Sequence, residues 1–342
     1  MRAVVYEAYG AAPVVRDVDP PTCPPDGVLV AVRATGVCRS DWHAWRGHDP
    51  VPLPMVPGHE LAGTIAEVGA EVTGWSVGDR VTAPFVMGCG RCGWCRAGEQ
   101  QVCPDQQQPG FTYAGSWAEL VAVPAATTNL VALPDEVGFV AGAALGCRFA
   151  TSYRALVTHG QVREGDWVAV HGCGGVGLSA VMVARALGAH VVAVDPGEDA
   201  RHLASELGAQ LVLDPGAVDG IPAVTDGGAH VSLDAVGTPG TARASIECLR
   251  RRGRHVQVGL LLGDHASPAL PMDRVVAHEL SVHGSHGMPS GQYADMLDLI
   301  RTGALDLGRL VRRTVTLEEA PAELMALDDP SRARGITVVE LG

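Results

Sequence analysis

The stretch "DWVAVHGCGGVGLSAVMVARALGAHVVAVD" (Asp166–Asp195) decides the fold of the region around it, because the spacing of its apolar residues changes twice. "DWVAVHG" is a short apolar run typical of a buried strand, "VGLSAVMVARALGA" is long enough for a helix, and "HVVAVD" predicts a second strand. "DARHLASELGA", "LVLD", "HVSLDAVG" and "RHVQVGLL" continue the alternation. Strands joined by helices lie parallel in one sheet, so we expect a doubly wound parallel α/β sheet over residues 151–286.

The turn between the first strand and the helix carries a glycine motif. Gly172, Gly174 and Gly177 have the G-x-G-x-x-G spacing, and Asp195 ends the next strand. These glycines would permit a tight turn, close approach of a pyrophosphate to the helix N-terminus, and packing of helix on strand. Asp195 would bind ribose hydroxyls and repel a 2′-phosphate, which favours NAD over NADP. The alternative is a plain glycine turn followed by a capping aspartate. The expected cofactor contacts are Gly172, Gly174, Gly175, Val176, Gly177 and Asp195.

Length, charge and composition narrow the class of protein. A chain of 342 residues exceeds one ordinary core and predicts two domains. The net charge of −13 argues against nucleic acid and anionic membranes as partners. The chain contains no lysine, which excludes Schiff-base enzymes and the phosphate-loop lysine. The start does not resemble a signal peptide, and no apolar stretch is long enough to span a bilayer, so we expect a cytoplasmic protein.

The flanking regions have a different pattern. The first 150 residues contain short apolar runs cut by glycine and proline, such as "GVLVAVRATGV" and "AGTIAEVGAEV", and predict a mostly β domain over 1–150. A predicted helix (Gln292–Thr302) and the run "ITVVEL" follow near the end of the chain. We expect residues 287–342 to rejoin the first domain.

The segment "CGRCGWCRAGEQQVC" (Cys89–Cys103) has the spacing C-x2-C-x2-C-x7-C. Four thiolates on one short loop can close a tetrahedron around Zn²⁺. Disulfides are the alternative, but cytosolic cysteine clusters bind metal more often. A closed tetrathiolate leaves no position for substrate, so this lobe (about residues 88–104) predicts a structural zinc site. Its expected ligands are Cys89, Cys92, Cys95 and Cys103.

A second motif carries a family resemblance. "GHELAGTIAEVGAEV" (Gly58–Val72) follows the pattern G-H-E-x2-G-x5-G-x2-V, which resembles the signature of zinc-containing alcohol dehydrogenases of the medium-chain dehydrogenase/reductase superfamily. The resemblance extends over essentially the whole chain, through the segments around Cys38 and Cys147, the cysteine lobe and the nucleotide fold. It implies a mostly β GroES-like catalytic domain beside a Rossmann NAD-binding domain. It also implies reversible, zinc-dependent hydride transfer between an alcohol and NAD.

The resemblance implies roles for residues around a catalytic zinc. Cys38, His59 and Cys147 would bind the metal and leave a fourth position for water or alcohol. Asp41 resembles the carboxylate that orients the histidine ligand, and Glu60 is a possible alternate ligand behind the metal. Two zinc ions per chain are therefore expected, one catalytic and one structural.

The same resemblance implies a proton relay and further cofactor contacts. Ser40 would take the alcohol proton and pass it through a cofactor ribose hydroxyl to His43, which faces water. His48 is expected on a loop. Arg39 resembles the residue that pairs with the cofactor pyrophosphate. Thr151, Val236 and Val258 complete the expected cofactor contacts.

Several aromatic residues lie beside the metal motifs, and they bear on the substrate. They could line a pocket for a primary, aromatic or apolar alcohol, or they could pack an ordinary core. They are Trp42, Trp45, Phe85, Trp117 and Phe149. The alternatives are a polyol or amino-alcohol dehydrogenase of the same superfamily, or a non-enzymatic nucleotide-binding relative. By analogy with relatives we expect a homodimer or homotetramer that acts on a small-molecule alcohol or aldehyde.

Overall fold

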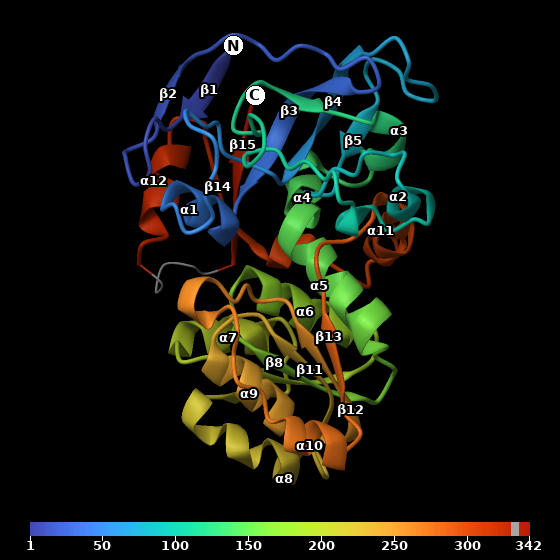
Figure 1. Cartoon of the computed structure of the whole chain (residues 1–342), viewed down its shortest axis with the longest axis vertical. Helices are drawn as coiled ribbons and strands as arrows, with labels where there is room; N and C mark the ends of the chain where they lie inside the picture. The colour runs from blue at the N-terminus through green and yellow to red at the C-terminus, as the bar shows by residue number, and fades with distance from the viewer. Residues whose placement is uncertain (330–334) are drawn as a thin grey trace. The chain divides into compact units, whose positions relative to one another are not determined.

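The computed structural model describes residues 1–329 and 335–342. The chain divides into two compact units (Figure 1). The first unit contains Met1–Ala150 together with the C-terminal segment from Gly287, and the second contains Thr151–His286.

The second unit is built on a six-stranded sheet with the order β10-β9-β8-β11-β12-β13. Every neighbouring pair in it is parallel. The strands are β8 (Trp167–His171), β9 (His190–Val194), β10 (Leu211–Leu213), β11 (Ala229–Asp234), β12 (Leu249–Gln257) and β13 (Ser281–Gly284). The order reverses at β8, which begins the chain of crossovers, and this is the doubly wound arrangement that the sequence predicts.

Helices cover this sheet. They are α5 (Ala150–Arg154), α6 (Gly175–Ala186), α7 (Glu198–Glu206), α8 (Ile221–Val224), α9 (Pro239–Glu247) and α10 (Met272–Ala277). Helix α6 packs against β8 and β9, and α9 packs against β11 and β12 (Figure 1). The run from Leu178 to Ala184 in α6 is buried throughout, which explains its unbroken apolar sequence.

The first unit is mostly β. A two-stranded sheet pairs β1 (Arg2–Val5) with β2 (Val14–Asp17). A seven-stranded sheet has the order β14-β15-β3-β4-β5-β7, with β6 also paired to β3. Its strands are β3 (Val28–Val37), β4 (Leu61–Val68), β5 (Arg80–Thr82), β6 (Leu120–Val123), β7 (Val131–Ala132), β14 (Val311–Val315) and β15 (Ile336–Glu340).

Strand β3 is the centre of this sheet. Its long apolar run pairs antiparallel with β4, β6 and β15, so the last strand of the chain lies beside one of the first. The helices of the unit are α1 (Arg39–Trp45), α2 (Gly93–Arg96), α3 (Ala126–Asn129), α4 (Phe139–Ala144), α11 (Tyr293–Arg301) and α12 (Ala320–Ala326). A core that includes Tyr6, Ile65 and Trp117 fills the space under the sheet.

Two π-helical segments, Leu145–Phe149 and Ala155–Gly160, were not visible in the sequence, and the first bears on the site. The helix that begins with α4 widens into a π-helical turn at Leu145–Phe149 before α5. Such turns are rare and occur often at functional sites. This one carries Cys147.

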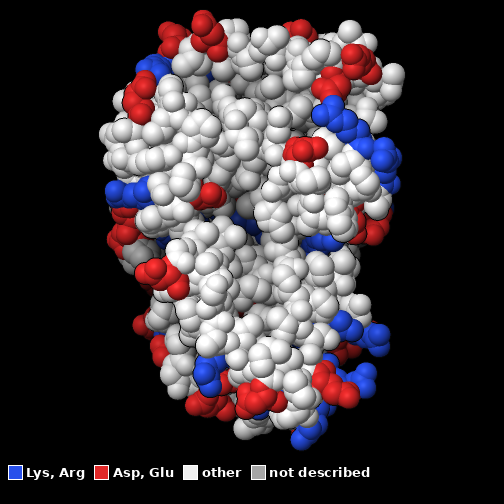
Figure 2. Space-filling view, in the orientation of Figure 1, with Lys and Arg blue, Asp and Glu red and all other residues white. Residues whose placement is uncertain are grey.

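On the face that Figure 2 shows, arginine and acidic side chains of the described residues are interspersed rather than gathered into one broad basic field. Among the described residues, no helix combines the length and apolarity needed to cross a bilayer.

Candidate active site and metal centres

Three potential metal ligands lie together in the first unit. The Sγ atoms of Cys38 and Cys147 and a ring nitrogen of His59 are all within 4.8 Å of one another. Cys38 follows the end of β3, His59 precedes β4, and Cys147 lies on the π-helical turn. Phe85 and Val86 pack against the two cysteines and keep the cluster in an apolar environment.

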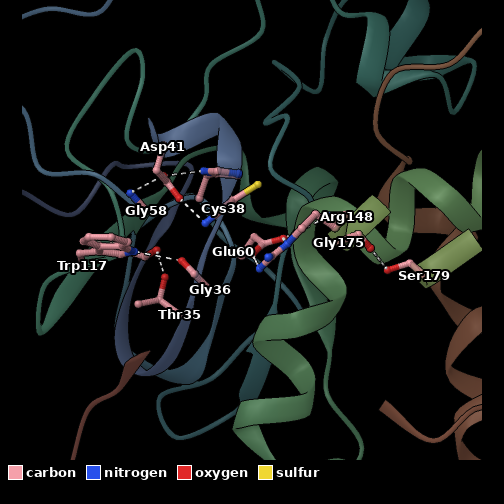
Figure 3. Close-up of polar contacts among 12 residues, drawn as sticks. Thr35, Gly36, Cys38, Asp41, Gly58, Glu60, Trp117, Arg148, Gly175 and Ser179 are labelled. Atoms are coloured by element: carbon pink, nitrogen blue, oxygen red, sulfur yellow. Dashed lines mark hydrogen bonds and ion pairs between the residues drawn. The ribbon is translucent and has the colours of Figure 1, made fainter. Parts of the chain in front are cut away.

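The His59 ring is oriented by a carboxylate. Asp41, buried in the first turn of α1, accepts a hydrogen bond from His59 Nδ1 at 2.9 Å. Its two oxygens also accept from the backbone N–H groups of Gly58 (3.1 Å) and Cys38 (2.9 Å), so Asp41 ties both ligand segments together (Figure 3). A neutral ring with its proton on Nδ1, the form that binds a metal, would present the lone pair of Nε2.

That Nε2 atom is buried and has no hydrogen-bond partner among the described residues. A buried polar atom without a partner requires an explanation, and metal coordination is one that a neighbouring pair of thiols supports. The hydrogen bond between the thiols lowers the pKa of Cys38 and raises that of Cys147. The donor set of two sulfurs and one imidazole nitrogen therefore fits Zn²⁺ with an open fourth position.

Glu60, next to His59, does not belong to this cluster of three. Its side chain is buried and forms an ion pair with Arg148, the residue after Cys147 (Figure 3). Arg148 Nε donates to Glu60 Oε1 at 3.0 Å, Nη2 donates to Oε2, and the Arg148 backbone N–H donates to Oε1 at 3.2 Å. Burial raises the pKa of Glu60, and the guanidinium opposes that shift. The sequence did not indicate where the Arg148 side chain points. In the structure its guanidinium contacts Glu60.

The proposed relay residues lie on α1. Ser40 and His43 are three residues apart and so share a face of the helix. Burial, the neighbouring His48 ring and Arg39 lower the pKa of His43 below that of an ordinary histidine. Arg39 lies over the Trp42 ring at 4.8 Å and donates to the carbonyl of Leu327 at 2.6 Å.

The cysteine lobe brings its four sulfurs together. All of them lie within 4.8 Å of one another, with Cys89 and Cys95 Sγ 4.0 Å apart and Cys92 and Cys103 Sγ 3.8 Å apart. A tetrahedral Zn²⁺ with bonds of about 2.3 Å would set its sulfurs about 3.8 Å apart. The Cys95 backbone N–H also donates to Cys92 Sγ at 3.4 Å, which fixes that sulfur within the lobe. The lobe can therefore hold a zinc ion, and its four sulfurs would fill the coordination sphere.

The glycine turn of the second unit has the geometry expected of it. Gly172 has φ +93°, a conformation that side-chain-bearing residues rarely adopt, and a Cβ on Gly177 would collide with the Gly172 carbonyl. Asp195 directly follows β9, accepts from the Cys173 N–H at 2.7 Å and from the Gly197 N–H at 2.8 Å, and so fixes the turn.

Sequence reasoning missed a second aspartate in this unit. Asp234, fully buried at the end of β11, accepts from the Val236 N–H at 2.8 Å and the Gly237 N–H at 3.1 Å. It also accepts from the side chains of Thr241 and Gln257 at 3.0 Å each. It holds the loop that presents Val236, whose side chain is exposed. The signal was an aspartate that ends a buried strand, as Asp195 does.

The aromatic residues near the motifs divide into two groups. Trp45 and Trp117 belong to the core of the first unit, Trp42 is partly buried against that core, and Phe149 is fully buried. The core-packing alternative therefore holds for these four. Phe85 instead contacts the cysteines and lies edge-on to His59 at 6.0 Å. Phe111, which the sequence did not single out, also lies edge-on to the His59 ring, with the two ring centroids 5.4 Å apart.

Comparison with known proteins defines the class. A family profile for the alcohol dehydrogenase GroES-like domain matches residues 24–135, and one for zinc-binding dehydrogenases matches residues 175–302. With the fold, these matches define a zinc-type oxidoreductase with a GroES-like and a Rossmann domain. The chain belongs to the zinc-containing alcohol dehydrogenase family of the medium-chain dehydrogenase/reductase superfamily.

Three similar proteins illustrate the range of this family. An alcohol dehydrogenase of Geobacillus stearothermophilus is 34% identical, with 93% of each chain covered. A sorbitol dehydrogenase of Halalkalibacterium halodurans is 33% identical over 93% of this chain and 94% of that protein. The structure of the alcohol dehydrogenase TADH from Thermus sp. ATN1 superposes with a TM-score of 0.92, at 32% identity and with 100% of both chains covered.

Proposed function

We propose that this chain is an NAD-dependent alcohol dehydrogenase that oxidises primary, aromatic or otherwise apolar alcohols and reduces the corresponding carbonyl compounds. The observation that carries the proposal is the buried Nε2 of His59, which has no hydrogen-bond partner among the described residues and lies beside the thiols of Cys38 and Cys147. An open zinc site of this kind is a catalytic one, whereas the four-sulfur lobe would be structural.

Cys38, His59 and Cys147 would hold the catalytic zinc, which when bound supplies Lewis-acid polarisation of the substrate oxygen. Asp41 keeps the His59 ring in the tautomer that presents Nε2. Phe85 packs against the cluster and excludes water from one side of it. The ion pair with Arg148 balances the negative charge of the Glu60 carboxylate next to the ligand His59.

The proton of the alcohol leaves through α1 in this proposal. Ser40 Oγ would accept it as its own hydroxyl proton moves on, and the His43 ring would take up a proton next. A bound cofactor would supply a ribose hydroxyl for this path. A base must be neutral to accept a proton, and the lowered pKa of His43 keeps its ring neutral at physiological pH.

NAD would bind with its pyrophosphate at the N-terminus of α6, where Gly174 is exposed and no side chain caps the helix, so that its first backbone N–H groups could bind a ligand. Gly172, Gly175 and Gly177 would shape the turn around it. Asp195 uses one lone pair of each oxygen for backbone N–H groups, so another on each remains for ribose hydroxyls. The loop of Val236, after β11, and the segment at Val258, after β12, would complete the part of the site that the second unit supplies, together with Thr151.

The substrate preference rests on the apolar surroundings of His59, to which Phe85 and Phe111 contribute. A polyol dehydrogenase is a second candidate because one relative is a sorbitol dehydrogenase. Initial rates with primary, secondary, aromatic and polyhydroxylated alcohols, each with NAD and with NADP, separate the two. We expect the highest kcat/KM with an apolar alcohol and NAD. A preference for sorbitol or a related polyol would support the second candidate.

We also propose that the chain forms a homodimer or homotetramer through the second unit. Among the described strands, β13 forms one edge of this sheet. Val282 on β13 and Leu260 in the loop after the neighbouring β12 have exposed side chains. An unpaired edge with apolar neighbours favours association. Sedimentation velocity would show a monomer if the proposal is wrong.

A further inference from the structure

Two histidine rings meet on the outer side of α1. His43 Nδ1 and His48 Nδ1 are 3.3 Å apart, and the ring centroids are 5.6 Å apart. Two nitrogens at this distance share one proton, because one ring donates and the other accepts. The His43–His48 pair is therefore a single hydrogen-bonded unit.

The backbone brings this pair together. Helix α1 ends at Trp45, and the turn that follows folds back so that the N–H of His48 donates to the carbonyl of His43 at 2.9 Å. The Trp42 ring then packs edge-on against both imidazoles, at 5.0 Å from His43 and 5.1 Å from His48. The Trp42 indole N–H is fixed by Asp328 at 2.7 Å. The turn and the packing of both rings against Trp42 thus bring the two histidines together.

The two rings of the pair differ in how far they are exposed to solvent. His43 is half-buried and His48 is exposed. The charges that act on His43 are those of His48 and Arg39, which lower its pKa along with burial, and that of Cys38, which raises it. Asp49 in the same turn has a pKa raised by burial, and Asp328 pairs with Arg46. A proton on His43 is consequently held weakly, with an exposed acceptor in direct contact.

We propose that His48 is the outer member of the proton path and receives from His43 the proton that the substrate releases. This rests on the proposed function, in which His43 accepts that proton. A proton arriving at His43 Nε2 makes an imidazolium, which gives its Nδ1 proton to His48 Nδ1. His48 then releases its Nε2 proton to water. Both rings are left neutral in the other tautomer, and exchange with water restores the starting pair.

The test compares His48→Gln, which can accept a hydrogen bond but cannot carry a proton at neutral pH, with the wild type. His202→Gln is the matched control, because His202 is a highly exposed histidine on α7 in the other unit. The zinc-loaded enzyme is mixed with NAD and its best alcohol in weak buffer, and proton release is followed with a pH indicator. We expect release to slow about 3- to 10-fold in His48→Gln, since water replaces an outermost group in part. Added imidazole should restore the rate, and the control should match the wild type.

A second measurement does not require turnover. NMR titration of ring-labelled histidines in the NAD-free, zinc-loaded protein should show a higher pKa for His43 in His48→Gln than in the wild type, because a cationic neighbour is gone. An unchanged rate of proton release in an active His48→Gln enzyme would overturn the proton path. An unchanged His43 pKa in this variant would overturn it as well. A wild-type enzyme that oxidises no alcohol would instead overturn the proposed function, and the proton path with it.

Discussion

Arg148 donates hydrogen bonds to both carboxylate oxygens of Glu60, and the two buried side chains each follow a candidate zinc ligand in the sequence. The pair joins the π-helical turn of Cys147 to the segment of His59, which are far apart in the sequence. A Cβ on Gly36 would collide with the Glu60 carboxylate, so the neighbouring strand β3 is shaped around it. Glu60 could therefore act as the expected alternate ligand only if its ion pair with Arg148 breaks.

The first prediction concerns this pair. Arg148→Met leaves an uncompensated buried carboxylate and should lower the free energy of unfolding by about 3–5 kcal/mol. The double variant Arg148→Met/Glu60→Gln removes both charges and should recover most of that loss. Denaturant unfolding of the zinc-loaded proteins measures both values. Equal stability of the single variant and the wild type would mean that the pair is not a buried ionic contact.

The second prediction separates the two metal sites. Cys95→Ser should lower the melting temperature and the zinc content from about two ions to about one per chain, because a structural zinc contributes to folding directly. The folded fraction should keep its turnover. Cys38→Ser should lose turnover and one zinc with little change in melting. Thermal unfolding and elemental analysis test this, and an equal loss of stability in both variants would contradict the division of roles.

The third prediction concerns cofactor choice. Asp195→Ser removes a charged acceptor for the ribose hydroxyls and the repulsion of a 2′-phosphate. The preference for NAD over NADP in kcat/KM should shrink by about 1–3 kcal/mol, the scale of one charge-assisted hydrogen bond. A wild-type enzyme that already prefers NADP would show that the reading of Asp195 is wrong.

The fourth prediction follows from the lowered pKa of His43. A histidine base works in its neutral form, so a pKa below the ordinary value extends the working range toward acid pH. His43→Gln should therefore reduce alcohol oxidation most below neutral pH, by about 10²-fold or less, since water can replace it. Zinc content and NAD affinity should stay near wild type. Loss of zinc or of stability would instead mean that His43 only packs the helix.

Local patterns made part of this structure predictable. The alternation around Asp166–Asp195 identified the parallel sheet, because strand and helix periodicities differ within a few residues. The spacing of Cys89–Cys103 placed four sulfurs on one loop, and the structure brings them together. In both cases the residues that matter are close in the sequence.

Contacts between distant segments were not predictable. The partners Arg148 and Glu60 are 88 positions apart, and they meet where the π-helical turn that carries Arg148 lies against the segment of Glu60. The His43–His48 contact is local, but it was not predictable either, because it depends on a turn closed by a backbone hydrogen bond. Trp45 and Trp117 lie near motifs in the sequence but fill the core, because large apolar side chains gain most from burial.

The most direct measurement is a crystal structure of the zinc-loaded protein with anomalous diffraction data collected at the zinc edge. The account predicts two peaks per chain, one of them equidistant from the four sulfurs of the lobe. The other should lie about 2.3 Å from Cys38 and Cys147 Sγ and about 2.0–2.1 Å from His59 Nε2, with a fourth ligand that is not a side chain of this protein. A single peak at the lobe, or a second zinc whose fourth ligand is Glu60, would contradict it.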